Sequence, residues 1–262
     1  MKPEAAVAAV LVEVTGGVGR LTLNVPDRLN AVDTAMLDAL EAGVASLIAD
    51  PHVRVLTITG AGRGFCAGAN LAVDVSGSAE VDSGTLYAAG RVSRALVACP
   101  KPTVALVNGV AAGVGVSLAL GCDYVLATES ASFVLAFAKI GLMPDGGATA
   151  LVAASIGRTR AMRMALTGEK VPALTAAQWG LVSETVPDSE FHARGEAVLD
   201  FLAASAPAAV AETKSAINAA CLELDAALAR EEDGQTRLMR SADFREGVDA
   251  FLGKRRPTFV GS

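Results

Sequence analysis

KPTVALVNGVAAGVGVSLALGCD, from Lys101 to Asp123, is the stretch of sequence that decides the fold. Its uncharged part, Pro102–Cys122, matches the length of about 20 apolar residues that a transmembrane helix needs. Yet it opens with Thr103–Val107, which is rich in β-branched residues, and continues with the turn dipeptide Asn108-Gly109. The stretch therefore predicts a buried strand, a glycine-rich turn and a short buried helix that begins near Gly113, rather than a membrane span.

The composition is that of a soluble protein with one large α/β domain, or a main domain and a smaller appendage. The chain has 262 residues, of which 52% are hydrophobic and only 4% aromatic, so the core is expected to consist of Ala, Val and Leu. The formal net charge is -6. An acidic chain does not suit general binding to nucleic acid, so we expect no nucleic-acid partner.

The cysteines and the two ends of the chain indicate where the protein works. The four cysteines are far apart and match no metal-ligand spacing, which predicts buried thiols in a reducing compartment and no metal site. The apolar run Ala5–Val12 is bracketed by Glu4 and Glu13, so a signal peptide is not expected. Val260–Ser262 is not a peroxisomal address. We expect a cytoplasmic protein with no membrane partner.

The first part of the chain alternates strands and helices. Val10–Val14 and Arg20–Asn24 are expected to form a hairpin, Ala35–Ala49 an amphipathic helix, and Val53–Thr59 a strand. A strand, helix, strand order is typical of a parallel sheet. Because a unit of two strands and a helix recurs farther along, the sequence predicts an α/β fold built as a spiral.

The last part of the chain is expected to be helical. We divide the sequence into an α/β core that holds the functional site, residues 1–187, and a helical region, residues 188–262. The later elements are predicted as a helix over Leu86–Ala98, strands over Tyr124–Ala127 and Ala131–Leu135, a turn at Gly141–Gly147, a helix through Ile156, and four helical pieces separated at Pro207, Cys221 and Ser241.

Two glycine-rich turns are candidates for a binding site. The run from Gly60 to Gly64 follows a strand but does not have the spacing of a dinucleotide-binding motif. Phe65–Leu71 and Gly109–Gly115 each place small residues with exposed amides between a strand end and a helix start. If the turns converge, their N–H groups form an oxyanion hole. The alternative is that the glycines only permit close packing.

Ordered motifs in this region carry a resemblance to a known family. The run TITGAGRGFCAGANL at Thr57–Leu71, with NVPDRLNA at Asn24–Ala31 before it and the turn Asn108–Gly115 after it, resembles the crotonase (enoyl-CoA hydratase/isomerase) superfamily. The resemblance covers nearly the whole chain. It implies a spiral of ββα units, a C-terminal helical trimerisation region and acyl-CoA thioester substrates.

The same resemblance implies which residues bind the substrate. The backbone amides of Ala69 and Val114 are the expected oxyanion donors. Coenzyme A enters as part of the substrate, so no separate cofactor is expected. Its implied contacts are Arg28, Ala31, Ala67, Asn70 and Leu71. The implied assembly is a homotrimer or a dimer of trimers.

Departures from the family pattern bear on the chemistry. Ser117 and Phe137 stand where the family's hydratases carry their catalytic glutamates. A carboxylate remains at Asp145, and in the family's double-bond isomerases an acidic residue at this turn is the proton shuttle. Ile140–Gly147 and Trp179–Leu181 are most similar to the ring 1,2-epoxyphenylacetyl-CoA isomerase group.

Asp145 is therefore the expected catalytic base of an enoyl-CoA double-bond isomerase. The alternative task for this side chain is to cap the helix that follows Gly146. The alternatives for the whole protein are an enoyl-CoA hydratase or another thioester-enolate reaction, and a CoA-binding homologue without useful chemistry. The residues expected to line the pocket do not indicate the acyl chain.

Overall fold

Between residues 55 and 134, strands that follow one another in the chain alternate between two sheets. In the computed structural model, which describes residues 8–70 and 83–261, these sheets have six and four strands. The larger sheet has the order β1-β2-β3-β5-β7-β10, and the smaller has the order β4-β6-β8-β9. The strands are β1 (Val10–Thr15), β2 (Val18–Leu23), β3 (Val55–Gly60), β4 (Gly64–Cys66), β5 (Thr103–Val107), β6 (Val110–Ala112), β7 (Tyr124–Thr128), β8 (Ser132–Val134), β9 (Val171–Pro172) and β10 (Glu184–Val186).

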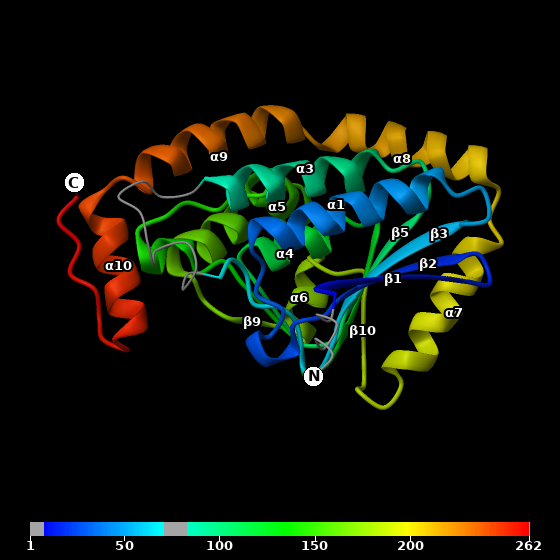
Figure 1. The fold of residues 1–262 in the computed structure, drawn as a ribbon, viewed down its shortest axis with the longest axis horizontal. Helices are drawn as coiled ribbons and strands as arrows, with labels where there is room; N and C mark the ends of the chain where they lie inside the picture. The colour runs from blue at the N-terminus through cyan, green and yellow to red at the C-terminus, as the bar shows by residue number, and fades with distance from the viewer. Residues whose placement is uncertain (1–7, 71–82, 262) are drawn as a thin grey trace, which may run out of the picture.

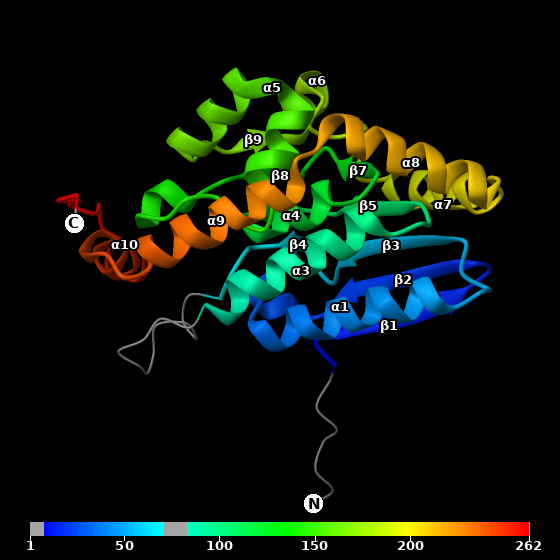
Figure 2. The same ribbon diagram turned by 90° about the horizontal axis from the view of Figure 1, so that it is seen from above.

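The order of these strands describes a spiral. Within the described residues, β3 and β4 are followed by helix α3 (Gly84–Ala98), β5 and β6 by α4 (Val114–Leu120), and β7 and β8 by α5 (Ala148–Thr167). Each unit adds one strand to each sheet, parallel to the strand of the unit before it. The predicted α/β fold, a spiral of ββα units, is confirmed by this order (Figure 1; Figure 2).

Helices cover both faces of the larger sheet. Leu56 and Ile58 of β3 belong to the main core, which also contains the apolar face of α1 (Thr34–Ala49). Val55, on the opposite face of the same strand, packs in a second core with α7 (Phe191–Ala203). Burial on both faces explains why β3 and β5 consist almost entirely of buried residues, as parallel strands usually do.

The stretch with the central glycine turn folds as predicted. Strand β5 leads through a turn into β6, and the buried helix α4 begins at Val114, directly after Gly113. All seven residues of α4 are buried. Within residues 8–70 and 83–261, no helix is both long and apolar enough to cross a membrane.

The C-terminal part forms four helices that are divided where predicted. After α7 come α8 (Pro207–Cys221), α9 (Leu224–Leu238) and α10 (Ala242–Leu252). Helices α8 and α9 follow one another along one side of the molecule, and α9 lies over α3 and α5 (Figure 1; Figure 2). Helix α10 then packs against the short 3-10 helix η2 (Phe137–Ile140). The C-terminal helices therefore return to the core at the end where the glycine turns lie.

One helix is longer than predicted. The helix expected to run through Ile156 continues to Thr167, because a second helical segment follows Gly157. Gly157 itself has φ 74° and ψ 161°, which is not helical, so a break does occur just after Ile156. The remaining helices are α6 (Ala173–Trp179) and the 3-10 helix η1 (Pro26–Arg28).

Candidate active site

Two glycine turns meet where the paired strands β4 and β6 end. Gly68 follows β4 and Gly113 follows β6. A Cβ atom placed on Gly68 would lie 3.8 Å from the Gly113 Cα and 3.0 Å from the Ala112 carbonyl oxygen. Both glycines have positive φ, +93° and +52°, which L side chains rarely adopt. The turns that were expected to converge are therefore in contact.

The residues after these glycines are Ala69 and Val114, and their N–H groups are not used by the backbone pairing around them. Ala69 pairs with Val32 through a bridge in which the Val32 amide donates to Gly68 and the Asn70 amide donates to Val32, so the N–H of Ala69 faces the other side. Val114 is the first residue of α4, and the first amides of a helix have no partner within the helix. Two such donors, one at the positive end of a helix, suit a negatively charged oxygen.

Other glycines in these turns are there for packing. A Cβ atom on Gly115 would lie 2.4 Å from the Cys66 carbonyl oxygen, and one on Gly109 would lie 2.2 Å from the Arg63 carbonyl oxygen. No side chain fits at such distances. The packing alternative therefore holds for Gly109 and Gly115, whereas Gly68 and Gly113 shape the turns that present the amides.

A cavity of about 490 Å³ opens at the two turns. It is lined by the three residues expected to be catalytic, Ala69, Val114 and Asp145, and also by side chains from α9 and α10. The expected coenzyme A contacts Arg28, Ala31, Ala67 and Asn70 line it too, whereas Leu71 lies outside the described residues. The structure thus brings the predicted site residues that it describes to one place.

Asp145 is a buried carboxyl group with one oxygen free. Its Oδ2 accepts a hydrogen bond from the Gln235 Nε2 at 2.9 Å, and its Oδ1 has no hydrogen-bond partner among the described residues. Burial raises the pKa of Asp145 from its ordinary value of 3.8 to about 7; the Gln235 hydrogen bond lowers it, and the charge of Glu231 raises it. A carboxyl group with such a pKa can both take and return a proton near neutral pH.

Asp145 does not cap the following helix. The N-cap of α5 is Gly147, and Glu231 accepts the first amides of that helix, from Gly147 at 2.7 Å and from Thr149 at 2.8 Å. The capping alternative for Asp145 is therefore wrong. Because a carboxylate from α9 satisfies these amides, the Asp145 side chain is left to the cavity.

The two positions at which hydratases carry glutamate have other tasks here. Ser117 is fully buried, and its hydroxyl donates to the Asp145 backbone oxygen at 2.8 Å. The ring of Phe137 lies over the second turn, with its Cζ 3.4 Å from where a Gly113 Cβ would be. Of the described residues that line the cavity, Asp145 is the only one with a carboxyl group.

Sequence reasoning missed the contribution of the C-terminal helices. Gln235 of α9, Met239 directly after α9, and Phe244 of α10 line the cavity. A signal was present, because Glu231, Gln235 and Met239 are four residues apart and so share one helix face. Nothing in the sequence indicated which loop this face would meet.

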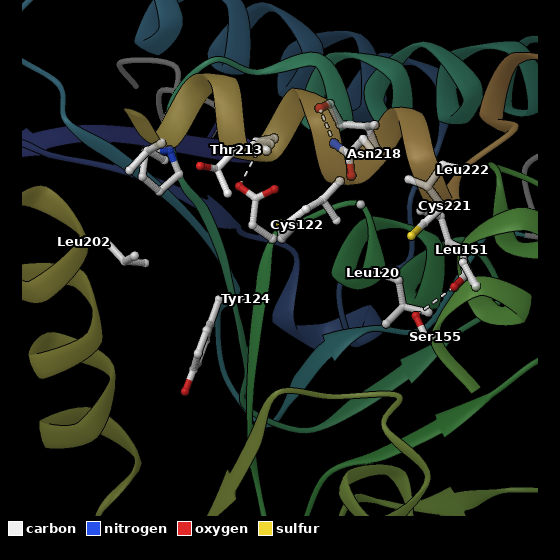
Figure 3. Close-up of a pocket in the computed structure, with 18 of the residues that line it drawn as sticks. Leu120, Cys122, Tyr124, Leu151, Ser155, Leu202, Thr213, Asn218, Cys221 and Leu222 are labelled. Atoms are coloured by element: carbon white, nitrogen blue, oxygen red, sulfur yellow. Dashed lines mark hydrogen bonds and ion pairs between the residues drawn. The ribbon is translucent and has the colours of Figure 1, made fainter. Parts of the chain in front are cut away.

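A second cavity, of about 630 Å³, contains none of the predicted site residues. It lies between the C-terminal end of α4, α5 and α8, and Figure 3 shows side chains such as Leu120, Leu151 and Leu222 in its wall. The buried Lys214 Nζ lies 2.9 Å from the Asp123 Oδ2 and donates to the Leu96 carbonyl oxygen at 3.0 Å. These charged groups satisfy one another, so the ion pair itself is not free for chemistry; the exposed Cys221 also lines this cavity.

The prediction of buried thiols is confirmed for Cys66, Cys99 and Cys122 and is wrong for Cys221, which is exposed at the end of α8, a helix with little buried surface. Burial raises the pKa of the Cys66 and Cys122 thiols to about 12, so both stay protonated and unreactive. In the part of the chain that the structure describes, no group of three or more His, Cys, Asp or Glu side chains is placed to hold a metal ion.

Comparison with known proteins shows the family. The family model described as enoyl-CoA hydratase/isomerase matches residues 13–262. The chain belongs to this family. Among its enoyl-CoA hydratase/isomerase relatives, the 1,2-epoxyphenylacetyl-CoA isomerase of Escherichia coli (strain K12) is 42% identical over 257 residues, which are 96% of this chain and 98% of the relative. A probable enoyl-CoA hydratase of Rhodobacter capsulatus is 41% identical over 250 residues, 95% of this chain and 96% of the relative.

A solved structure supports the same assignment. The crystal structure of an enoyl-CoA hydratase from Mycobacterium avium subsp. paratuberculosis has a TM-score of 0.90 and 48% identity, over 97% of this chain and 99% of that one. The chain is thus an acyl-CoA-processing enzyme of the crotonase type, which confirms the predicted family. Its relatives carry both isomerase and hydratase names, so the names do not decide between the two reactions.

Proposed function

We propose that this family member shifts the double bond of an enoyl-CoA, with Asp145 as the proton shuttle. The observation that carries the proposal is the unpartnered Oδ1 of Asp145, a residue that lines the same cavity as Ala69 and Val114. A basic oxygen and an oxyanion site in one largely apolar cavity are the two parts that such a reaction needs.

The reaction begins at the thioester. Its carbonyl oxygen accepts hydrogen bonds from the Ala69 and Val114 amides, and each preorganised donor stabilises the developing enolate charge by about 3 kcal/mol, or about 10²–10³ in rate. Asp145 takes a proton from a carbon next to the double bond, and electrons move towards the thioester oxygen. The same carboxyl group returns the proton to the carbon two positions away, so one group completes the shift.

Hydration fits this cavity less well. Adding water requires one group that deprotonates the water and another that protonates the neighbouring carbon. The positions that hold these two groups in hydratases are Ser117 and Phe137 here, and Ser117 is occupied in holding the Asp145 backbone. The preference for isomerisation rests on this difference.

Incubation with 2-enoyl-CoA and 3-enoyl-CoA thioesters of several lengths in deuterated water tests the proposal. We expect the two isomers to interconvert with uptake of deuterium and with little 3-hydroxyacyl-CoA. Asp145→Asn keeps the shape of the side chain, so it should keep the affinity for the thioester but lose about 10²–10⁴ in the rates of exchange and isomerisation. Net hydration faster than isomerisation would favour a hydratase, and unchanged exchange in Asp145→Asn would rule out the shuttle.

We propose that Arg28, Ala31, Ala67 and Asn70 contact the coenzyme A part of the substrate. Arg28 is exposed and also lines the cavity, so its guanidinium can reach an anionic group at the entrance. Leu71 stays a prediction. If Arg28 meets a phosphate, Arg28→Gln raises KM at low salt and has little effect at high salt, where surface charges are screened.

We also propose a homotrimer held by the helices of residues 188–262. Of the fifteen residues of α8 only Lys214 is buried, and Ile217 is 57% exposed. Phe201 on the neighbouring α7 is 74% exposed. Exposed apolar surface of this kind marks protein contacts. Light scattering should give the mass of three or six chains and a smaller mass for Ile217→Asp; a monomeric wild type would contradict the proposal.

A further inference from the structure

One face of α9 turns two buried polar side chains towards the loop that carries Asp145. Glu231 is 0% exposed and Gln235 is 1% exposed, and the two are one helical turn apart. Buried polar groups are costly unless they are hydrogen-bonded, so these side chains are expected to have specific partners. Both find them in the segment from Met143 to Thr149.

The hydrogen bonds of Gln235 leave its amide only one orientation. Its Oε1 accepts from the Met143 backbone amide at 3.0 Å, and its Nε2 donates to the Asp145 Oδ2 at 2.9 Å. A backbone N–H can only donate, so the oxygen of Gln235 must face Met143. The NH₂ group must then face Asp145, in either ionisation state of the carboxyl group.

We propose that Gln235 is the positioning residue that makes Oδ1 of Asp145 the oxygen that carries the substrate proton. Oδ2 is engaged by an N–H donor that cannot accept a proton, whereas Oδ1 has no partner among the described residues. The proton taken from the substrate forms an O–H bond at Oδ1 and leaves from the same atom. This inference rests on the proposed isomerase function and goes beyond it, because it assigns a task to a C-terminal helix.

The loop is also held by contacts that do not touch the Asp145 carboxyl group. Glu231 accepts from the Gly147 and Thr149 amides, and Ser117 donates to the Asp145 backbone oxygen. These groups hold the backbone, while Gln235 alone among them holds the carboxyl group itself. The two tasks are separable by substitution, with Glu231 as the matched control for Gln235.

The charges around Asp145 predict that substitutions of Gln235 and of Glu231 shift the pKa of Asp145 in opposite directions. Glu231 on α9 is a negative neighbour, and the cationic Arg28 and Lys139 line the same cavity from η1 and η2. The Gln235 donor stabilises ionised Asp145 and lowers its pKa, while Glu231 raises that pKa. Removing the donor should therefore raise the pKa of Asp145, and neutralising Glu231 should lower it.

Gln235→Met tests the inference, because it keeps the length of the side chain and removes both hydrogen bonds. We expect kcat for isomerisation to fall about 10–100-fold with KM changed less than about threefold, since a small misplacement of a catalytic group has such an effect. The pH at which kcat reaches half of its maximum should rise by about one unit. Glu231→Gln should move that midpoint downward.

A second variant covers the case in which Gln235→Met does not fold. Gln235→Glu keeps the shape and the acceptor for the Met143 amide and replaces the donor with an acidic group, so the midpoint should again rise. Midpoints and kcat equal to the wild type in the folded variants would overturn the inference. A fall in thermal stability with no change in the pH profile would also overturn it. Isomerisation that survives Asp145→Asn is a different result, because it removes the proposed function itself.

Discussion

Two cavities of this protein, the one beside Lys214 and the one beside Asp145, differ in how their buried charged groups are satisfied. In the larger one, Lys214 is paired with Asp123 and also donates to a backbone carbonyl, so the charge is neutralised in place. In the smaller one, the Asp145 Oδ1 has no partner among the described residues, and burial raises the pKa of Asp145. Cavity size would favour the cavity beside Lys214, whereas an unsatisfied polar group beside two turn amides favours the site that we propose.

This difference in hydrogen bonding also distinguishes the structural ion pair of Lys214 and Asp123 from Asp145, the carboxyl group that we propose to be catalytic. A buried charge with complete hydrogen bonding stabilises one conformation of the chain. A buried carboxyl group with an incomplete set of hydrogen bonds lowers the stability of the folded protein. Such groups are concentrated at sites where a bound substrate supplies the missing partner. Substitutions in the two cavities should therefore have opposite consequences for stability and activity.

The first prediction from this comparison concerns the amides of the Asp145 cavity. In Gly113→Ala, the side chain enters a backbone conformation with φ +52° and meets Phe137, so the Val114 amide should move. We expect kcat to fall about 10²-fold or more, as for the loss of one oxyanion donor. Gly16→Ala is the control, since Gly16 has φ +59° and no atom within 4 Å of a new Cβ. Equal kcat in both variants would remove the oxyanion role from this turn.

The second prediction uses the cost of burying Asp145. Its pKa in the folded protein is about 7, above the ordinary value of 3.8, so the folded state binds the proton more tightly. This contribution to stability is present below about pH 4 and is lost as the pH rises through about 7. Asp145→Asn should therefore exceed the wild type in free energy of unfolding by about 2–4 kcal/mol at pH 8.

Urea unfolding of both proteins at pH 4 and pH 8 measures this difference. The advantage of Asp145→Asn should nearly disappear at the lower pH, because the carboxyl group is then protonated in the folded state and close to half protonated in the unfolded state. An equal difference at the two pH values would show that the buried carboxyl group is not the cause.

The third prediction concerns the other cavity and has a smaller effect. Lys214→Met should lower the free energy of unfolding by about 2 kcal/mol, because Asp123 loses its cation but keeps its bonds from Thr103. Asp123 is partly exposed, so water compensates for some of the loss. Isomerase kcat per folded molecule should stay unchanged. A large fall in kcat at full occupancy of the folded state would connect this cavity to the chemistry.

Much of the fold was predictable because the local sequence signals and the packing of the core favour the same secondary-structure elements. The β-branched run Thr103–Val107 and the glycine at Gly113 were enough to expect β5, a turn and α4, and the structure has these elements. The predicted helix through Ile156 was too short, since a glycine break does not show that a helix resumes on its other side. The short elements β4, β6, β9, β10 and α6 were not predicted, because segments this short carry little periodicity.

The site was predictable only in part, because its parts are far apart in the chain. The motifs around Ala69, Val114 and Asp145 are each short and local, so the sequence could indicate them and the cavity contains all three. Gln235 and Asp145 are separated by 90 positions, and Glu231 and Gly147 by 84. Which loop the face of α9 would meet depends on the packing of the whole chain. For that reason the sequence left capping of α5 as an alternative task for Asp145, whereas Glu231 accepts these amides.

The rate of double-bond shift in a 3-enoyl-CoA, measured for wild type, Asp145→Asn and Lys214→Met in parallel, tests the central claim most directly. The proposal predicts that Asp145→Asn loses about 10²–10⁴ in kcat while its affinity for the thioester is kept. It also predicts that folded Lys214→Met turns over at the wild-type rate. Wild-type turnover by Asp145→Asn would contradict the assignment of the active site to the smaller cavity.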